Sequence, residues 1–206
     1  MTKPAMPFDV NAVPQAAASA NDRMPPIAEA DLTEAQRAAV AEFRGSRGQQ
    51  IGGPYVPLLR SPEVFLACNR MGRHLRFNGV LPARLSELAI IVTARRWTQG
   101  YEWYAHRRIA EQAGLAPAIC DAVGEGRIPD AMADDEAAVY AFATELHRNG
   151  QVCDLTYARA RSLAGEAGVV ELAAICGYYT LLAMVMNVAR TPLPAGADDE
   201  IEPFRG

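Results

Sequence analysis

The chain has 206 residues, a formal net charge of −4 and a hydrophobic content of 50%, which predicts a folded domain rather than a disordered chain. The acidic balance excludes a basic footprint over the whole chain, so we expect no nucleic-acid partner. Of the 20 basic residues, 19 are arginine. Because the only lysine is Lys3, we expect no Schiff-base, pyridoxal-phosphate or P-loop lysine.

The cysteines form no CxxC pair and have no zinc-ligand spacing, so we expect no metal site and a reduced, cytoplasmic protein. They are Cys68, Cys120, Cys153 and Cys176. The segment before Ala18-Ser19-Ala20 has no continuous apolar stretch. We therefore interpret residues 1–30 as a flexible arm and not as a targeting signal.

Helical periodicity predicts a single all-α domain over residues 31–195, followed by a tail at 196–206. Between the first two helices, residues 45–59 contain four glycines and two prolines, which is typical of a long and often functional loop. The eight predicted helices are Thr33–Arg44, Pro62–Phe77, Pro82–Trp97, Tyr101–Ala113, Ala116–Val123, Asp134–Arg148, Asp154–Leu163 and Val169–Arg190.

Residues 172–189 carry no charge, and this length reaches the lower limit of a transmembrane helix. The segment contains a glycine, two tyrosines, a threonine and an asparagine. A helix that is apolar all round is also typical of a protein core or a subunit interface. We therefore expect a buried helix and no membrane partner.

Glu87 precedes a stretch, Leu88 to Val92, that is apolar on every face of its predicted helix, so we expect this helix to be buried. Ile90, Ile91 and Ala94 follow Glu87 on the same face. A carboxylate in such a helix needs a partner, or its pKa rises until it is neutral. One alternative is structural, with Glu87 serving the helix N-terminus or pairing with Arg84 at i−3.

Glu102 and His106 are spaced i,i+4 and share a face of the next helix, with Gln99 one turn earlier. A neighbouring carboxylate raises the pKa of an imidazole and orients its ring, and the helix dipole favours ionised Glu102. The structural alternative is a solvent-exposed ion pair contributing about 0.3–0.5 kcal/mol. The aromatic residues around them are typical of an amphipathic pocket or an interface: Trp97, Tyr101, Trp103 and Tyr104.

Leu85-Ser86-Glu87 and the run Tyr101-Glu-Trp-Tyr-Ala-His106 together resemble the core motif of the carboxymuconolactone decarboxylase family. That family is grouped with the alkyl hydroperoxidase D-like (AhpD-like) superfamily. The resemblance is strongest over residues 82–115 and extends over about residues 53–193. It implies an all-α AhpD-like helical bundle that assembles into trimers or hexamers, with active sites near the subunit contacts.

The peroxidase branch of this superfamily carries glutamate, two cysteines and histidine at fixed spacing. On this chain those positions are Glu87, Gln99, Glu102 and His106, so both cysteines are replaced. Peroxidase chemistry by thiolate attack and disulfide formation is therefore disfavoured.

The decarboxylase branch lacks the thiol pair and removes CO₂ from a small unsaturated lactone acid in aromatic-compound catabolism, without a cofactor. The resemblance implies that His106 is the general acid/base, with Glu102 and Glu87 orienting it. Gln99 or Tyr101 would donate to the developing oxyanion.

The small anionic organic substrate also needs a cation and a pocket wall. Arg84 and Arg107 are the first candidates for its carboxylate, and we expect Trp103, Tyr55 and Tyr178 in the wall. Two further alternatives are a cofactor-free isomerase or lactone hydrolase and a non-catalytic oligomeric binding protein. His74 and His147 have no comparable neighbours, and we interpret them as surface or helix-end residues.

Overall fold

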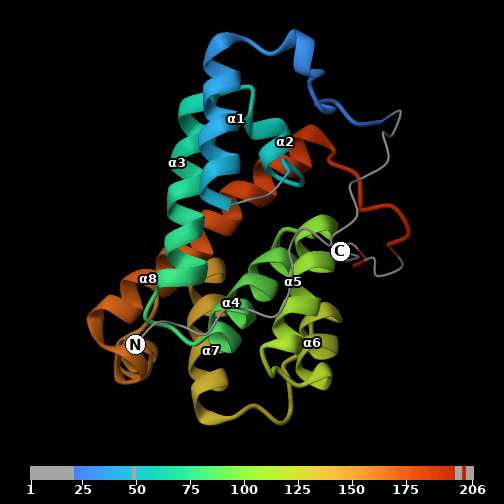
Figure 1. Cartoon of the computed structure of the whole chain (residues 1–206). Helices are drawn as coiled ribbons and strands as arrows, with labels where there is room; N and C mark the ends of the chain where they lie inside the picture. Colours follow the sequence, from blue (N-terminus) through green and yellow to red (C-terminus); the bar gives the residue numbers. More distant parts are fainter. Residues whose placement is uncertain (1–20, 48–49, 198–200, 203–206) are drawn as a thin grey trace.

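The computed structural model describes residues 21–47, 50–197 and 201–202. Most of the expected N-terminal arm and of the expected tail, and also Lys3, lie outside these ranges. The described residues form eight α-helices, a short 3-10 helix η2 (Glu29–Asp31) and a π-helical turn η3 (His74–Asn78), with no strand among them (Figure 1). This architecture confirms the all-α fold class.

The first helices form one half of the molecule, in which α1 (Glu34–Arg47) packs against α3 (Pro62–Arg73) (Figure 1). At the start of α1, the Gln36 backbone N–H donates to Thr33 Oγ1 and the Thr33 N–H donates to Gln36 Oε1. This reciprocal capping box stabilises the start of α1. Pro62 occupies the first turn of α3, as its fixed φ favours.

The prediction of an uninterrupted loop up to Leu59 is wrong, because α2 (Tyr55–Leu58) forms inside it. Pro54 precedes this helix with φ −62° and ψ −22°, which already are helical angles. Tyr55 and Leu58 bury their side chains in the core. Burial of apolar side chains therefore stabilises a helical turn that the proline and glycine content argued against.

The next helix also differs from the prediction, which extended it unbroken to Phe77. The α-helical part ends at Arg73, and the following five residues form the wider π-helical turn η3. Such single π-turns are rare and occur frequently at functional sites. This one supplies Arg76 to the site described below.

The central helix is α4 (Ala83–Arg96), which packs against α5 (Gly100–Gln112), α6 (Pro117–Gly124), α7 (Asp134–Asn149) and α8 (Asp154–Ala189). Eleven consecutive residues of α4, from Leu85 to Arg95, are buried. Each fully buried leucine or isoleucine contributes about 1.5–3 kcal/mol relative to an exposed one. The surrounding helices therefore hold α4 firmly.

The long helix α8 runs past both halves of the molecule (Figure 1). Its backbone is non-helical at Ala164 and Gly165, and Gly165 has φ +66°, a left-handed angle that favours glycine. The prediction of two helices on either side of this point is therefore confirmed. By length and composition alone α8 could cross a membrane, but the core helix of a soluble protein passes the same test, and 44% of its most apolar window is buried inside the fold.

Both described ends of the chain are tied to the helices. The Arg23 backbone N–H donates to the Ala189 carbonyl at 2.8 Å, and Arg95 Nη1 donates to the Glu202 carbonyl at 2.8 Å. These bonds place residues 21–25 beside the end of α8 and residue 202 beside the end of α4.

Candidate active site

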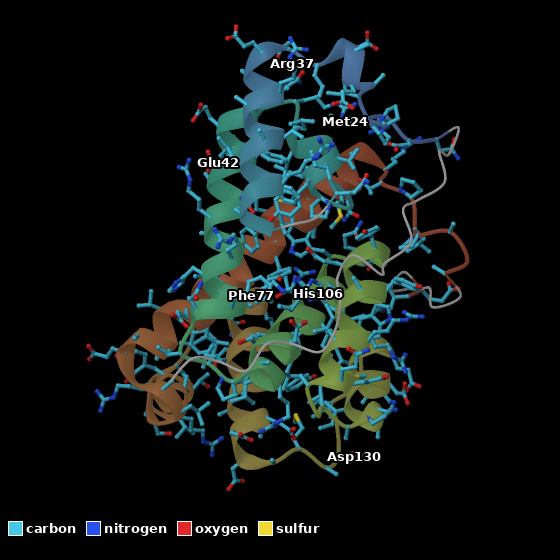
Figure 2. The ribbon with its side chains drawn as sticks, in the orientation of Figure 1. Met24, Arg37, Glu42, Phe77, His106 and Asp130 are labelled. Atoms are coloured by element: carbon cyan, nitrogen blue, oxygen red, sulfur yellow. The ribbon has the colours of Figure 1, made fainter. Side chains whose placement is uncertain are left out.

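Three helices bring a cluster of polar side chains into the middle of the molecule, where Figure 2 labels His106. Helix α4 supplies Glu87, α5 supplies Glu102 and His106, and α8 supplies Tyr179. The exposed fractions of Glu87, Glu102 and His106 are 2%, 3% and 8%. Polar groups buried this deeply cost free energy unless they are paired, so their partners define the site.

The strongest pairing in the cluster joins His106 to Glu87. The distance from His106 Nδ1 to Glu87 Oε2 is 2.6 Å, and both side chains are largely buried. Because a carboxylate only accepts hydrogen bonds, Nδ1 carries the donated proton. The bond fixes the tautomer and the orientation of the ring and leaves Nε2 as the nitrogen open to proton transfer.

Glu102 lies on the same face of α5 but has a different environment. Neither carboxylate oxygen has a hydrogen-bond partner among the described residues. Burial raises the pKa of Glu102 well above its ordinary value. Two expectations are therefore wrong: Glu102 does not form a solvent-exposed ion pair with His106, and the helix dipole does not outweigh burial in setting its ionisation.

Tyr179 completes the cluster from α8. Its ring packs edge-on against the His106 ring, with the centroids 4.9 Å apart. Burial raises the pKa of the Tyr179 hydroxyl, the charge of Arg76 lowers it, and Glu87 and Glu102 raise it. The Tyr179 hydroxyl is thus within electrostatic range of Arg76 and of both carboxyl groups.

Arg76 is the residue that the sequence analysis missed. It lies in the π-helical turn η3 and is partly buried. Helical periodicity did not single out this arginine, because the extra residue in a π-turn shifts the face on which a side chain emerges.

Gln99 holds the backbone rather than facing the cluster. Its Oε1 accepts the Glu102 backbone N–H at 2.9 Å, capping α5, and its Nε2 donates to Asn187 Oδ1 at 3.2 Å. Asn187 Nδ2 in turn donates to the Trp97 carbonyl at 3.0 Å. Both ends of the Gln99 amide are therefore engaged in tying α5 to α8.

The two arginines expected to bind substrate have carboxylate partners within the chain. Arg84 pairs with Asp135 at 2.7 Å and also with Glu136. Arg107 pairs with Glu111 at 3.2 Å and with Asp121 at 2.5 Å. The alternative in which Arg84 pairs with Glu87 is wrong, because Arg84 reaches across to α7 instead.

The expected aromatic wall residues fall into two groups. Tyr178 donates a hydrogen bond to the Cys68 carbonyl at 3.0 Å, and the Tyr55 hydroxyl lies 3.1 Å from that of Tyr178. The Tyr178 ring packs edge-on against Tyr179 at 5.2 Å, so this chain of tyrosines reaches the cluster.

Tyr101 and Trp103 are not part of this series of tyrosines and have other neighbours. The Tyr101 ring lies against Gly53, where an added Cβ would be 2.6 Å from Tyr101 Cε1. Burial raises the pKa of Tyr101 to about 12. Trp103 is 1% exposed and packs against Gly124, and Arg107 lies 5.9 Å from its ring centroid.

The cysteines are free thiols, and three of them are buried. Burial raises the pKa of Cys68, and raises those of Cys120 and Cys176 to about 12. In the described ranges no group of three or more histidine, cysteine, aspartate or glutamate side chains is placed to hold a metal ion.

Comparison with protein-family models and with curated proteins gave no match. Among solved structures, the fold is similar to the AhpD core of a peroxidase-related protein from Ralstonia eutropha JMP134, at 19% identity and a TM-score of 0.68 over 86% of this chain and 95% of that one. It is also similar to a peroxidase-related protein from Silicibacter sp. TM1040, at 13% identity and a TM-score of 0.68 over 89% and 97%. The debrominase Bmp8 is similar at 15% identity, with a TM-score of 0.65 over 86% and 95%. The chain therefore has the AhpD-like fold.

Proposed function

We propose that this protein is an enzyme that uses histidine and glutamate acid–base chemistry, without a cofactor, on a small unsaturated lactone or carboxylic acid. Decarboxylation, in aromatic-compound catabolism, is the reaction proposed first. The observation that carries the proposal is the buried 2.6 Å bond between His106 and Glu87, with the unpaired carboxyl of Glu102 on the same face of α5. Two carboxyl groups in environments this different are a common arrangement for separate acid and base roles.

In this proposal the two carboxyl groups take different roles: Glu87 acts on the imidazole, and Glu102 is the proton donor. Glu87 accepts the Nδ1 proton of His106 and stabilises the imidazolium form of the ring. Burial, which raises the pKa of Glu102, keeps a proton on that carboxyl. The site then contains a base, His106, whose ring is oriented by Glu87, and a carboxylic acid, Glu102, that donates a proton.

Arg76 and Tyr179 take the roles that the sequence analysis gave to other residues. Arg76 is the proposed source of positive charge for a second carboxylate that the substrate does not lose, because Arg76 is the cation that lowers the pKa of Tyr179. Tyr179 has a neutral hydroxyl, since burial raises its pKa. That hydroxyl is the proposed donor to the oxyanion in place of the engaged Gln99 amide.

The proposed step breaks one carbon–carbon bond. The departing carboxylate leaves as CO₂, and its bonding electron pair moves into the conjugated carbonyl to form an enolate. Glu102 or the His106 imidazolium then protonates the carbon, and water restores the proton. The developing negative charge needs donors already in place, which Tyr179 and Arg76 provide.

The experiment is a turnover assay on a panel of five-membered unsaturated lactones that carry one or two carboxylates. We expect the wild-type protein to release CO₂ from at least one of them, and His106→Gln to lower kcat by about 10²–10⁴-fold. His74→Gln is the matched control, because His74 is an exposed histidine that pairs with Glu171. Unchanged turnover by His106→Gln would remove His106 from the mechanism.

Product analysis separates the alternatives at the same site. Isomerisation or lactone hydrolysis consumes the lactone without releasing CO₂. Tight binding of a panel member with no turnover would favour a non-catalytic binding protein. A debrominase of this fold was solved with 2,3,4-tribromopyrrole, a small ring compound, which supports the choice of small ring substrates.

Thiol peroxidase activity is the second candidate, since two similar structures are peroxidase-related proteins. The raised thiol pKa values of Cys68, Cys120 and Cys176 argue against it, because the thiolate is the nucleophile. A variant with all four cysteines changed to alanine should keep its full turnover on the lactone panel. Loss of a peroxidase activity in that variant would favour the thiol reaction.

We also propose that the protein is a cytoplasmic homo-oligomer, a trimer or hexamer. Leu181, Met184 and Val188 lie on one face of α8 at i, i+3 and i+7, and all three are at least 40% exposed. An exposed apolar stripe on a helix commonly marks a protein contact.

A further inference from the structure

A cavity lies between α4, α6 and α7, formed by residues other than those of the His106 cluster. Its volume is about 300 Å³. None of its ten lining residues is acidic, and five are arginine or histidine. The lining residues are Val92, Arg95, Arg96, Val123, Gly126, Arg127, Tyr140, Thr144, His147 and Arg148.

The positive charge of this cavity is a local feature, because the whole chain has 24 acidic and 20 basic residues. Arg127 pairs with Glu125 at 2.5 Å. Among the described residues, no carboxylate pairs with Arg96 or Arg148, and both are exposed at the rim. The cavity therefore keeps an excess of positive charge that an anion would neutralise.

Arg95 and His147 carry that charge toward the interior. Arg95 is only 7% exposed, and burial lowers its pKa. A guanidinium remains charged even so. Burial, followed by the charge of Arg96, lowers the pKa of His147. The charge of Arg96 thus acts on the imidazole.

The His147 ring is held in place and is not a free surface histidine. Thr93 Oγ1 donates to the Ala89 carbonyl at 2.8 Å, so its lone pair accepts from His147 Nε2 at 2.8 Å. His147 does lie in the last turn of α7, as expected of a helix-end residue, but the expectation that it has no notable neighbours is wrong. With Nε2 engaged, Nδ1 is the ring atom left for a ligand.

The floor of the cavity is apolar. Val92 and Val123 are 8% and 4% exposed, and Tyr140 adds an aromatic face. Inorganic anions gain nothing from such a floor, whereas an aromatic ring gains about 25 cal/mol for each Å² that it buries. A volume of about 300 Å³ lies at the lower end of the range for small-molecule sites.

We propose that this cavity is a binding site for a small aromatic carboxylate, with the ring on Val92, Val123 and Tyr140 and the carboxylate on the arginines. Arg96 and Arg148 hold the carboxylate at the rim, and Arg95, whose Nη1 donates to the Glu202 carbonyl, lines the cavity from inside. This site is separate from the proposed chemistry at His106, so either proposal can fail without the other.

The test is isothermal titration calorimetry of the full-length protein with phthalate as the probe. Phthalamide, which has the same ring without charge, and inorganic phosphate, which has charge without a ring, are the comparison ligands. We expect phthalate to bind more tightly than either. The Arg96→Gln/Arg148→Gln variant should weaken phthalate binding by at least about tenfold, because it removes the charge-assisted hydrogen bonds.

The matched control is Arg159→Gln/Arg161→Gln, which removes the same charge from exposed positions on α8 outside the cavity. We expect its phthalate affinity to stay within twofold of wild type. The resonance of His147 should shift with phthalate in the wild type and in the control. Equal binding of phthalate and phosphate, or unchanged binding by the Arg96→Gln/Arg148→Gln variant, would overturn the proposal. No phthalate binding, together with a change in sedimentation of that variant, would instead assign the cavity to a contact between subunits.

Discussion

The buried carboxyl of Glu102 makes a prediction about stability that needs no knowledge of the substrate. Glu102→Gln keeps the shape of the side chain and removes its ionisation. In the folded protein burial raises the pKa of Glu102, whereas in the unfolded chain the carboxyl titrates near 4.3. Between those two pKa values the folded state binds more protons than the unfolded state.

The sign and size of the effect follow from proton linkage. The free energy of unfolding of the wild type falls by about 1.4 kcal/mol for each pH unit across that interval. The reason is that Glu102 keeps its proton in the folded state, whereas in the unfolded chain it has lost that proton to the solvent. Glu102→Gln lacks this dependence. Its stability relative to wild type should therefore rise with pH from about 4.3 up to the raised pKa and be level above it.

The assay is urea unfolding of the wild type and Glu102→Gln at pH 5, 6, 7 and 8, followed by circular dichroism. Glu166→Gln is the control, because Glu166 is exposed on α8. We expect the difference between Glu102→Gln and wild type to grow with pH, and the Glu166→Gln difference to stay flat. Parallel pH profiles for Glu102→Gln and wild type would refute the inference that Glu102 is protonated in the fold.

Three further predictions address the supports of the site and the assembly. Gly53→Ala should lower the free energy of unfolding by about 1–3 kcal/mol, measured by urea unfolding, because Gly53 has φ +54° and the new Cβ would clash with the Tyr101 ring. In the same assay Gln99→Ala should cost about 1–2 kcal/mol through loss of the α5 cap, and a change below about 0.3 kcal/mol would contradict that role. Met184→Glu should shift the protein to smaller species in sedimentation velocity, whereas Leu155→Glu, also at an exposed position on α8, should not.

Periodicity and end signals were enough to predict every described α-helix except α2. Thr33, Pro62 and Gly165 each carry a local backbone preference that acts within a few residues, so their effect is visible in the sequence. The helix α2 was missed because burial of Tyr55 and Leu58 stabilises it, and burial depends on distant parts of the chain.

The candidate site was predictable only in part, for the same reason. The i,i+4 spacing correctly placed Glu102 and His106 on one face, but the partner of His106 is Glu87, which comes from another helix. Which side chains meet between helices depends on how the helices cross, and one sequence does not reveal this. Arg76 was hidden by the π-helical turn, and Tyr179 could not be distinguished from Tyr178 without knowing which face of α8 is turned to α5.

The central claim is that His106 and Glu87 act as one acid–base unit, and a double-mutant cycle tests it most directly. The measurement is kcat/KM of the wild type, Glu87→Gln, His106→Gln and the double variant on the lactone acid that the wild type turns over. If Glu87 acts through His106, the double variant loses no more activity than His106→Gln alone. Losses that multiply in the double variant, or near-normal activity in either single variant, would contradict the account.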